Sequence, residues 1–315
     1  MKTSSNLERV LEAGEFAMTA ELNPPQNADP EVMKEKASIL KGYVDAFNAT
    51  DGQSAVVAMA SWAASLIGKQ EGLDPIVQMT CRDRNRIALQ MNILGVAALG
   101  INNILCLSGD PVFFGNYPEA KAVSDIESSE LVKIVKDLRD EKRFQNGESL
   151  VGREPQLFIG AVANPFADPL ELEATRLARK VEAGADFIQT QAIYNIKRFE
   201  RWMEIVRERE LHKKVKILAG ITPLKSAAIA RYMKTKLPGV DIPDELFERL
   251  RKVTTREQTQ REGIKIAVET INKMKEIEGV AGVHIMTIEW EEAIPEICEA
   301  SALYPRPLFE ELGRQ

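Results

Sequence analysis

The stretch ARKVEAGADFIQTQ, residues 178–191, contains the unit that decides the fold. It starts in an amphipathic helical segment, turns at Gly184 and enters an apolar strand at Phe187. Gly184 stands where the helix should end, because glycine readily adopts the left-handed backbone of a helix C-cap. A helix, a compact turn and a strand in this order are typical of a parallel sheet built from βα units.

The same unit recurs along the chain. The predicted strands are residues 16–22, 44–49, 76–80, 103–107, 156–161, 187–191, 216–221 and 282–288. The helices predicted to follow them are residues 30–40, 56–68, 84–99, 127–141, 169–183, 196–209, 225–233 and 290–300. Eight βα units in one chain predict an α/β fold of the closed (βα)8, or TIM, barrel type rather than an open sheet.

One segment exceeds this pattern. Residues 237–278 are too long for a plain βα loop, and Pro243 suits the first turn of a helix. Residues 244–253 and 256–277 are therefore predicted as extra helices before the last strand, so that residues 238–278 form a helical insertion outside the barrel. No low-complexity tract or Pro-rich linker divides the chain, which predicts that residues 1–315 form a single barrel domain.

Composition excludes several classes of protein. A formal net charge of −6 argues against a nucleic-acid binder. Three widely spaced cysteines and two histidines argue against a disulfide framework, a zinc site and an iron–sulfur cluster, and fit a reducing cytoplasm. Residues 1–9 do not resemble a signal peptide, and no apolar run reaches the roughly 18 residues of a membrane span.

In a (βα)8 barrel the active site is built from the carboxyl ends of the strands and the loops after them. This chain places amides, hydroxyls and carboxylates there. They are Glu21, Asn23, Asn48, Thr50, Asp51, Gln53, Gln78, Thr80, Arg82, Asp83, Ser108, Asp110, Asn164, Gln189, Thr190, Gln191, Thr222, Thr287 and Glu289. No nucleophile elbow, P-loop or dinucleotide-binding glycine motif is present, so a redox cofactor would bind at the barrel mouth.

Two of these carboxylates are candidates for chemistry. Glu21 ends an apolar strand, and a carboxylate inside the mouth would be partly desolvated, which suits a general acid. The alternative is a carboxylate that faces solvent or caps a neighbouring loop. Asp110 follows Gly109, which permits a close ligand approach, although Gly-Asp-Pro is also common turn chemistry.

Other side chains have two readings each. One helix face carries three basic residues, Arg176, Arg179 and Lys180. Together they could bind a phosphate, or they could form a solvent-exposed stripe. Trp290 could stack on a planar ligand or lie under the last helix. His284, within the eighth predicted strand, is expected to be a core histidine rather than a ligand.

A family resemblance joins these motifs. The segments TAELNPP (residues 19–25), MTCRDRNR (79–86), LSGDP (107–111), ARKVEAGADFIQTQ (178–191) and GITPL (220–224) resemble the methylenetetrahydrofolate reductase family. They occur in order at strand ends, and the resemblance spans residues 16–305. The forms QMTCRDRN and SGDP resemble a branch that includes reductases of acetogenic bacteria.

The resemblance implies an FAD-containing barrel that interconverts 5,10-methylene- and 5-methyltetrahydrofolate. Glu21 is then the general acid, Asp110 contacts the pterin near the flavin, and Gln191 and Thr222 bind the folate. The implied flavin-binding positions are Thr50, Asp51, Gln53, Gln78, Thr80, Ser108, Gly109, Asp110, Asn164, Arg176, Arg179 and Lys180. No metal site is implied, and an oligomer is expected.

The sequence departs from the better-known bacterial pattern at several of these positions. Ala227 replaces an aromatic residue, Trp290 replaces an arginine, and Gln78 and Asn164 replace histidines. Ala227 and Trp290 touch the region expected to hold the nicotinamide nucleotide. The electron source is therefore left open between NAD(P)H and a partner subunit that carries metal or iron–sulfur centres.

Two rival functions follow from the same residues. One is a pterin-binding TIM-barrel methyltransferase without redox chemistry. The other is a non-catalytic barrel that serves as a scaffold, and the joint presence of Glu21, Asp110 and Gln191 argues against it.

Overall fold

A computed structural model describes residues 1–236 and 239–307. Its strands form a closed barrel in sequence order, and every neighbouring pair is parallel. The strands are β1 (Ala17–Leu22), β2 (Ala46–Ala49), β3 (Pro75–Thr80), β4 (Asn103–Leu107), β5 (Phe158–Ala163), β6 (Phe187–Ala192), β7 (Lys216–Ile221) and β8 (Val280–Ile285). The predicted (βα)8 fold is confirmed.

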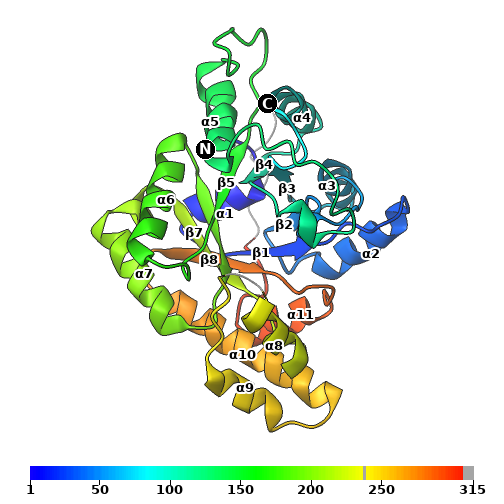
Figure 1. Ribbon diagram of the computed structural model, residues 1–315, viewed down its shortest axis with the longest axis vertical. Helices are drawn as coiled ribbons and strands as arrows, with labels where there is room; N and C mark the ends of the chain where they lie inside the picture. Colours follow the sequence, from blue (N-terminus) through cyan, green and yellow to red (C-terminus); the bar gives the residue numbers. More distant parts are fainter. Residues whose placement is uncertain (237–238, 308–315) are drawn as a thin grey trace.

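Helices surround the strands (Figure 1). They are α1 (Asn6–Glu12), α2 (Pro30–Leu40), α3 (Ser61–Gln70), α4 (Arg86–Ala98), α5 (Ser128–Lys136), α6 (Leu170–Ala183), α7 (Ile196–Glu208), α8 (Ala227–Lys236), α9 (Asp244–Arg251), α10 (Arg256–Glu276) and α11 (Ala293–Ala300). Gly184 ends α6 with a φ of 111°, as predicted for its C-cap. Across residues 1–236 and 239–307, no helix is long and apolar enough to cross a membrane.

Some predicted boundaries are corrected. The helix expected to begin at residue 56 begins at Ser61, because the preceding residues form the short helix η1 (Gln53–Ala55) and an extended loop. The strand expected at residues 282–288 ends at Ile285, which leaves Thr287 and Glu289 in the loop after it. The helix α1 was not predicted from the sequence.

The helix that completes the seventh βα unit is α10. Its apolar side, with Ile264, Ile271 and Met274, belongs to the main core together with Ile217 of β7 and Val283 of β8. Helices α8 and α9 pack in a separate cluster with Ile266 of α10 and with Tyr194 and Leu224, which follow β6 and β7. This corrects the predicted assignment, which gave the ring position to residues 225–233 and treated residues 256–277 as an added helix. The added helices are α8 and α9.

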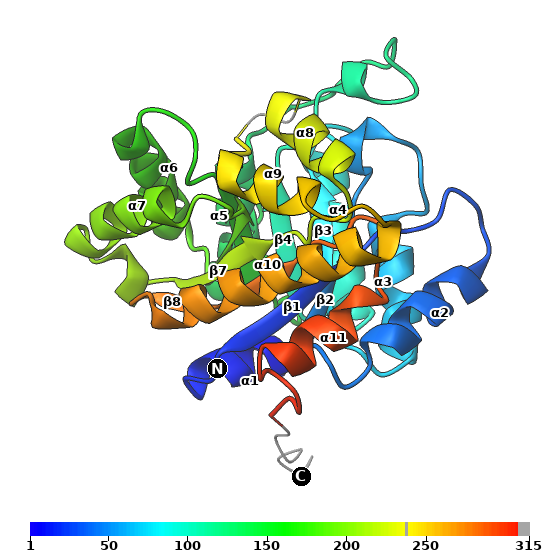
Figure 2. The same ribbon diagram turned by 90° about the horizontal axis from the view of Figure 1, so that it is seen from below.

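One end of the barrel is closed by an apolar plug. Leu7, Val10 and Leu11 of α1 pack against inward-facing residues of the strands, among them Phe158 and Phe187, whose rings stack with centroids 5.2 Å apart. Figure 2 shows α1 at this end and α8 and α9 toward the other. Because the strands begin at the plugged end, polar side chains near their carboxyl ends face the open mouth.

Candidate active site

A buried polar layer lies above the apolar plug. Asn48 Nδ2 donates to Gln189 Oε1 at 2.7 Å, and Gln189 Nε2 donates to Asn48 Oδ1 at 3.0 Å. Gln189 Nε2 also lies 3.3 Å from Thr19 Oγ1, which is 2.9 Å from His284 Nδ1. All four side chains are buried. The layer connects β1, β2, β6 and β8 and forms the floor of the mouth.

This floor gives a stability prediction. Gln189→Leu should lower the free energy of unfolding by about 1–3 kcal/mol, because it leaves the buried amide of Asn48 without its partner. Adding Asn48→Leu should recover much of that loss, since both polar groups are then gone. Urea unfolding of the wild type, both single variants and the double variant measures the coupling, and simple additivity would contradict it.

Glu21 stands directly above this floor. Its carboxylate is 10% exposed and accepts hydrogen bonds from Gln53 Nε2 at 3.2 Å and Gln78 Nε2 at 3.4 Å. His284 Nε2 lies 3.9 Å from Glu21 Oε2. The alternative in which Glu21 faces solvent does not hold. His284 is buried as predicted, but its second ring nitrogen faces the carboxylate. The sequence did not reveal this contact, which arises because Thr19 of β1 pairs with His284 of β8 in the barrel.

Asp110 lies on the rim of the mouth. It is exposed, and its Oδ2 accepts a hydrogen bond from the backbone N–H of Ser54 at 2.7 Å. Gly109 before it has a φ of 88°. Gln53 and Ser54 are consecutive, so one short segment contacts both Glu21 and Asp110.

Asp51 holds the end of β3. Its carboxylate accepts hydrogen bonds from the N–H and hydroxyl of Thr80, at 2.8 and 3.0 Å, and from both Nη atoms of Arg84, at 2.6 and 3.0 Å. Thr50 Oγ1 bonds Asn23 Oδ1 at 3.2 Å. These side chains are engaged with one another, so they fix the shape of the mouth.

The basic residues of α6 diverge. Lys180 points inward and donates to the carbonyl oxygen of Val162 in β5 at 2.6 Å, and its burial lowers the pKa of the ammonium. Arg176 is exposed and pairs with Glu173 at 2.5 Å, and Arg179 is exposed. Lys180 is therefore the member of the predicted trio that the structure brings closest to the barrel strands.

The remaining predicted residues occupy the rim. Gln191 is exposed on β6, two residues after Gln189. Thr222 follows β7, and its carbonyl oxygen accepts a hydrogen bond from the hydroxyl of Tyr194. Ser108 bonds Ser128 at 3.2 Å, and Asn164 accepts from the N–H of Phe166 at 3.0 Å.

Trp290 lies at the edge of this rim. It is partly buried against the core, with Lys225 Nζ 5.9 Å from its ring centroid. Its burial favours the second of the two sequence readings.

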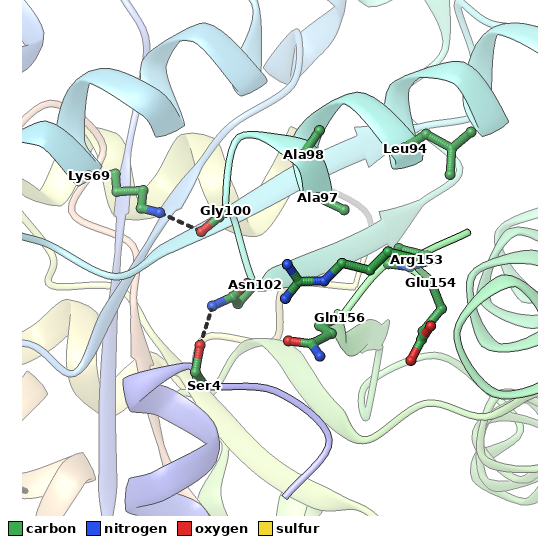
Figure 3. Close-up of a pocket in the computed structure, with 11 residues that line it drawn as sticks. Ser4, Lys69, Leu94, Ala97, Ala98, Gly100, Asn102, Arg153, Glu154 and Gln156 are labelled. Atoms are coloured by element: carbon green, nitrogen blue, oxygen red, sulfur yellow. Dashed lines mark hydrogen bonds between the residues drawn. The ribbon is translucent and has the colours of Figure 1, made fainter. Parts of the chain in front are cut away.

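A recess of about 430 Å³ lies at the opposite end of the barrel (Figure 3). Ser4, Gly100 and Gln156 line it, and these residues precede α1, β4 and β5. Lys69 Nζ donates there to the carbonyl of Gly100 at 2.6 Å. The recess is thus separate from the carboxylates. Within the described part of the chain, no cluster of three or more His, Cys, Asp or Glu side chains could hold a metal ion.

The family model of methylenetetrahydrofolate reductase matches residues 6–302. The chain belongs to the methylenetetrahydrofolate reductase family. The matched residues include every strand of the barrel and all the candidate site residues.

Named members of the family differ in length from this chain. Methylenetetrahydrofolate reductase 2 of Schizosaccharomyces pombe is 28% identical over 262 residues, which cover 81% of this chain and 39% of the yeast protein. The 5,10-methylenetetrahydrofolate reductase of Salmonella typhimurium is 23% identical over 240 residues, which cover 76% of this chain and 74% of the bacterial protein. The chain therefore spans well under half the length of the yeast relative.

A solved structure shares the fold. A protein from Clostridium thermocellum, described as binding two copies of 5-methyl-5,6,7,8-tetrahydrofolic acid, superposes with a TM-score of 0.64 at 16% identity. The superposition covers 95% of this chain and 100% of that one. Its barrel thus matches this member of the methylenetetrahydrofolate reductase family as a fold.

Proposed function

We propose that this protein reduces 5,10-methylenetetrahydrofolate to 5-methyltetrahydrofolate through a bound FAD. The observation that carries the proposal is Glu21, a carboxylate shielded inside the barrel mouth between Gln53, Gln78 and His284. Membership of the reductase family supports the reaction, and the folate ligand of the Clostridium thermocellum protein supports a pterin as the bound substrate.

Side chains around the mouth fit the tail of a flavin dinucleotide. Lys180 is partly buried, and its one hydrogen bond within the described residues goes to a neutral carbonyl. A partly desolvated cation without a hydrogen-bonded counter-charge favours an anionic partner, which a pyrophosphate would supply. Arg179 is exposed one residue earlier on α6. Ser108 and Gly109 are exposed just after β4, and Gly109 has a φ of 88° that leaves its backbone free of a side chain. FAD, when bound, would carry the two electrons as a hydride.

Glu21 would move the proton. Opening the one-carbon bridge requires a proton at the pterin nitrogen that loses it, and Glu21 is the shielded acid placed to give that proton. The amides of Gln53 and Gln78 can donate to a carboxylate or, turned over, accept from a carboxylic acid. They can therefore hold Glu21 in both protonation states. Asp110 would orient the pterin from the rim, with Gln191 and Thr222 on the β6–β7 side.

The source of the electrons is part of the proposal. We infer either NAD(P)H or a partner subunit with metal or iron–sulfur centres, because Ala227 and Trp290 alter the region expected to hold the nicotinamide. Trp290 is packed against the core with Lys225 above it. Three buried free thiols fit a reducing compartment, and we assign the protein to the cytoplasm.

The test is a sequence of spectra on the purified chain reconstituted with FAD. We expect a flavin spectrum that bleaches on chemical reduction and returns when methylenetetrahydrofolate is added without oxygen. Bleaching by NADH alone would identify a self-sufficient reductase, and no bleaching by NADH would point to the partner subunit. A chain that binds the folate but never FAD would favour the methyltransferase instead.

A further inference from the structure

Arg82 lies at the junction of three loops around the mouth. It is 6% exposed, and it follows β3. Its Nη1 donates to the carbonyl oxygens of Gly52 and Asp110, each at 3.1 Å. Its Nε and Nη2 bind the two carboxylate oxygens of Asp83 at 2.8 and 2.7 Å. Arg82 thus ties the loop after β2 to the loop after β4.

The backbone of Arg82 holds the far end of the same loop. Its carbonyl oxygen accepts from the N–H of Val123 at 2.7 Å and from that of Ser124 at 3.4 Å. Arg82 therefore contacts both ends of the segment from Asp110 to Val123. Phe113 and Phe114 within this segment are exposed.

The guanidinium of Arg82 has little capacity left for a ligand. Arginine has five N–H groups, and the contacts with Gly52, Asp110 and Asp83 make four hydrogen bonds. An anion receptor would present several open donors to the solvent. The contacts favour a role in fixing backbone over a role in binding phosphate or carboxylate.

The loop after β2, which Arg82 binds through Gly52, has a strained backbone. Ser54 and Ala55 have φ values of 54° and 57°, a region that side-chain-bearing residues seldom adopt because it is strained. Such a conformation persists only when its surroundings impose it. Here the restraints include the hydrogen bond from Arg82 to Gly52 and the hydrogen bond from Ser54 to Asp110, beside the close packing of Gly115 against Ala55.

This strained loop carries the contacts to both carboxylates. Gln53 donates to Glu21, and the N–H of Ser54 donates to Asp110. We propose that Arg82 is a positioning residue: by locking the loop after β2 in its left-handed form, it holds Glu21 and Asp110 in their reactive arrangement. The inference rests on the proposed reductase function.

The experiment measures reoxidation of chemically reduced, flavin-loaded protein by methylenetetrahydrofolate in a stopped-flow instrument. Arg82→Gln should slow this step at saturating folate by about 100-fold, the size expected from a misplacement of about 1 Å, while the folate concentration for half-maximal rate changes little. The matched control is Arg86→Gln, because Arg86 is an exposed arginine on the same segment, paired with Asp125. It should react like the wild type.

A second substitution separates positioning from general stability. Ser54→Gly removes the strain that Arg82 restrains, so in the Arg82→Gln background it should restore about tenfold of the lost rate. Ala302→Gly relieves an exposed residue with a φ of 52° far from the mouth and should restore nothing. If Arg82→Gln does not fold, Ser54→Val tests the same loop, because a β-branched residue tolerates this backbone poorly, and it should slow the step similarly.

The outcomes are distinct. Full-speed reoxidation by Arg82→Gln, or by Ser54→Val where that variant must replace it, overturns the inference and leaves the reductase function standing. Equal rescue by Ser54→Gly and Ala302→Gly also overturns it, since the effect would then be general stability. A wild-type flavoprotein that folate cannot reoxidise defeats the proposed function and the role of Arg82 with it.

Discussion

Glu21→Gln is expected to slow folate-dependent reoxidation of the reduced flavin by about 100- to 10,000-fold, the usual contribution of a general acid. Glutamine keeps the size of the side chain and its hydrogen bonds to Gln53 and Gln78, but its amide has no acidic proton that it could transfer to the substrate. Flavin content and the unfolding midpoint should stay close to those of the wild type, because Glu21 lies at the mouth rather than in the core.

The buried surroundings of Glu21 explain why the effect should be large. The carboxylate is 10% exposed, and His284 is 3.9 Å away, so water has little access to replace the missing proton donor. A solvent-facing carboxylate could be bypassed by a hydronium ion or buffer. We therefore also expect added carboxylic acid buffers to rescue the variant weakly.

The measurement is single-turnover reoxidation with chemically reduced flavin, which needs no knowledge of the physiological donor. Glu182→Gln is the matched control, since Glu182 is exposed on α6 away from the mouth. It should behave like the wild type. A Glu21→Gln variant that binds FAD, folds normally and reoxidises at the wild-type rate would rule Glu21 out as the acid.

The sequence predicted the barrel because its signals are local. Helix ends such as Gly184 and short apolar runs depend only on neighbouring residues, and the closed parallel sheet follows from their repetition. The role of α10 was missed because several helices follow β7, and only packing against Ile217 and Val283 shows which of them covers the barrel.

The candidate site was predictable only in part, for the same reason. Strand ends could be read from the sequence, so Glu21 and Asp110 were found. Arg82 was also read at a strand end and His284 within a strand, but their contacts were not predicted, because their partners lie far along the chain. His284 meets Thr19 and Glu21 only when β8 closes onto β1. Arg82 reaches Gly52 and Asp110 only when three loops converge, an arrangement that no spacing pattern encodes.

Arg306→Ala is expected to lower the free energy of unfolding by about 3–5 kcal/mol near neutral pH, the usual loss when one partner of a buried ion pair is removed. Arg306 binds both carboxylate oxygens of Asp45, at 2.6 and 3.0 Å, and also the carbonyl of Phe16 at 2.8 Å. The Asp45 side chain is fully buried, so no water can replace the guanidinium.

The loss should depend on pH. Burial raises the pKa of Asp45, and Arg306 opposes that rise. Because the folded pKa lies above the unfolded value of about 3.9, the stabilising contribution of this group is complete below that value and declines as pH increases through the folded pKa. Without Arg306 the pKa of Asp45 rises further, so the decline is larger and extends to higher pH. The stability gap between wild type and variant should therefore be smaller at about pH 5 than at about pH 8.

Urea unfolding across this pH range measures the gap. Asp45→Asn in the Arg306→Ala background removes the titrating group, so the pH dependence of the gap should largely disappear there. Arg261→Ala, which breaks an exposed pair with Glu257, should cost less than about 1 kcal/mol at any pH. A gap that is constant with pH would mean that Arg306 stabilises the chain through its carbonyl contacts with Phe16 and Leu303 rather than through the charge of Asp45.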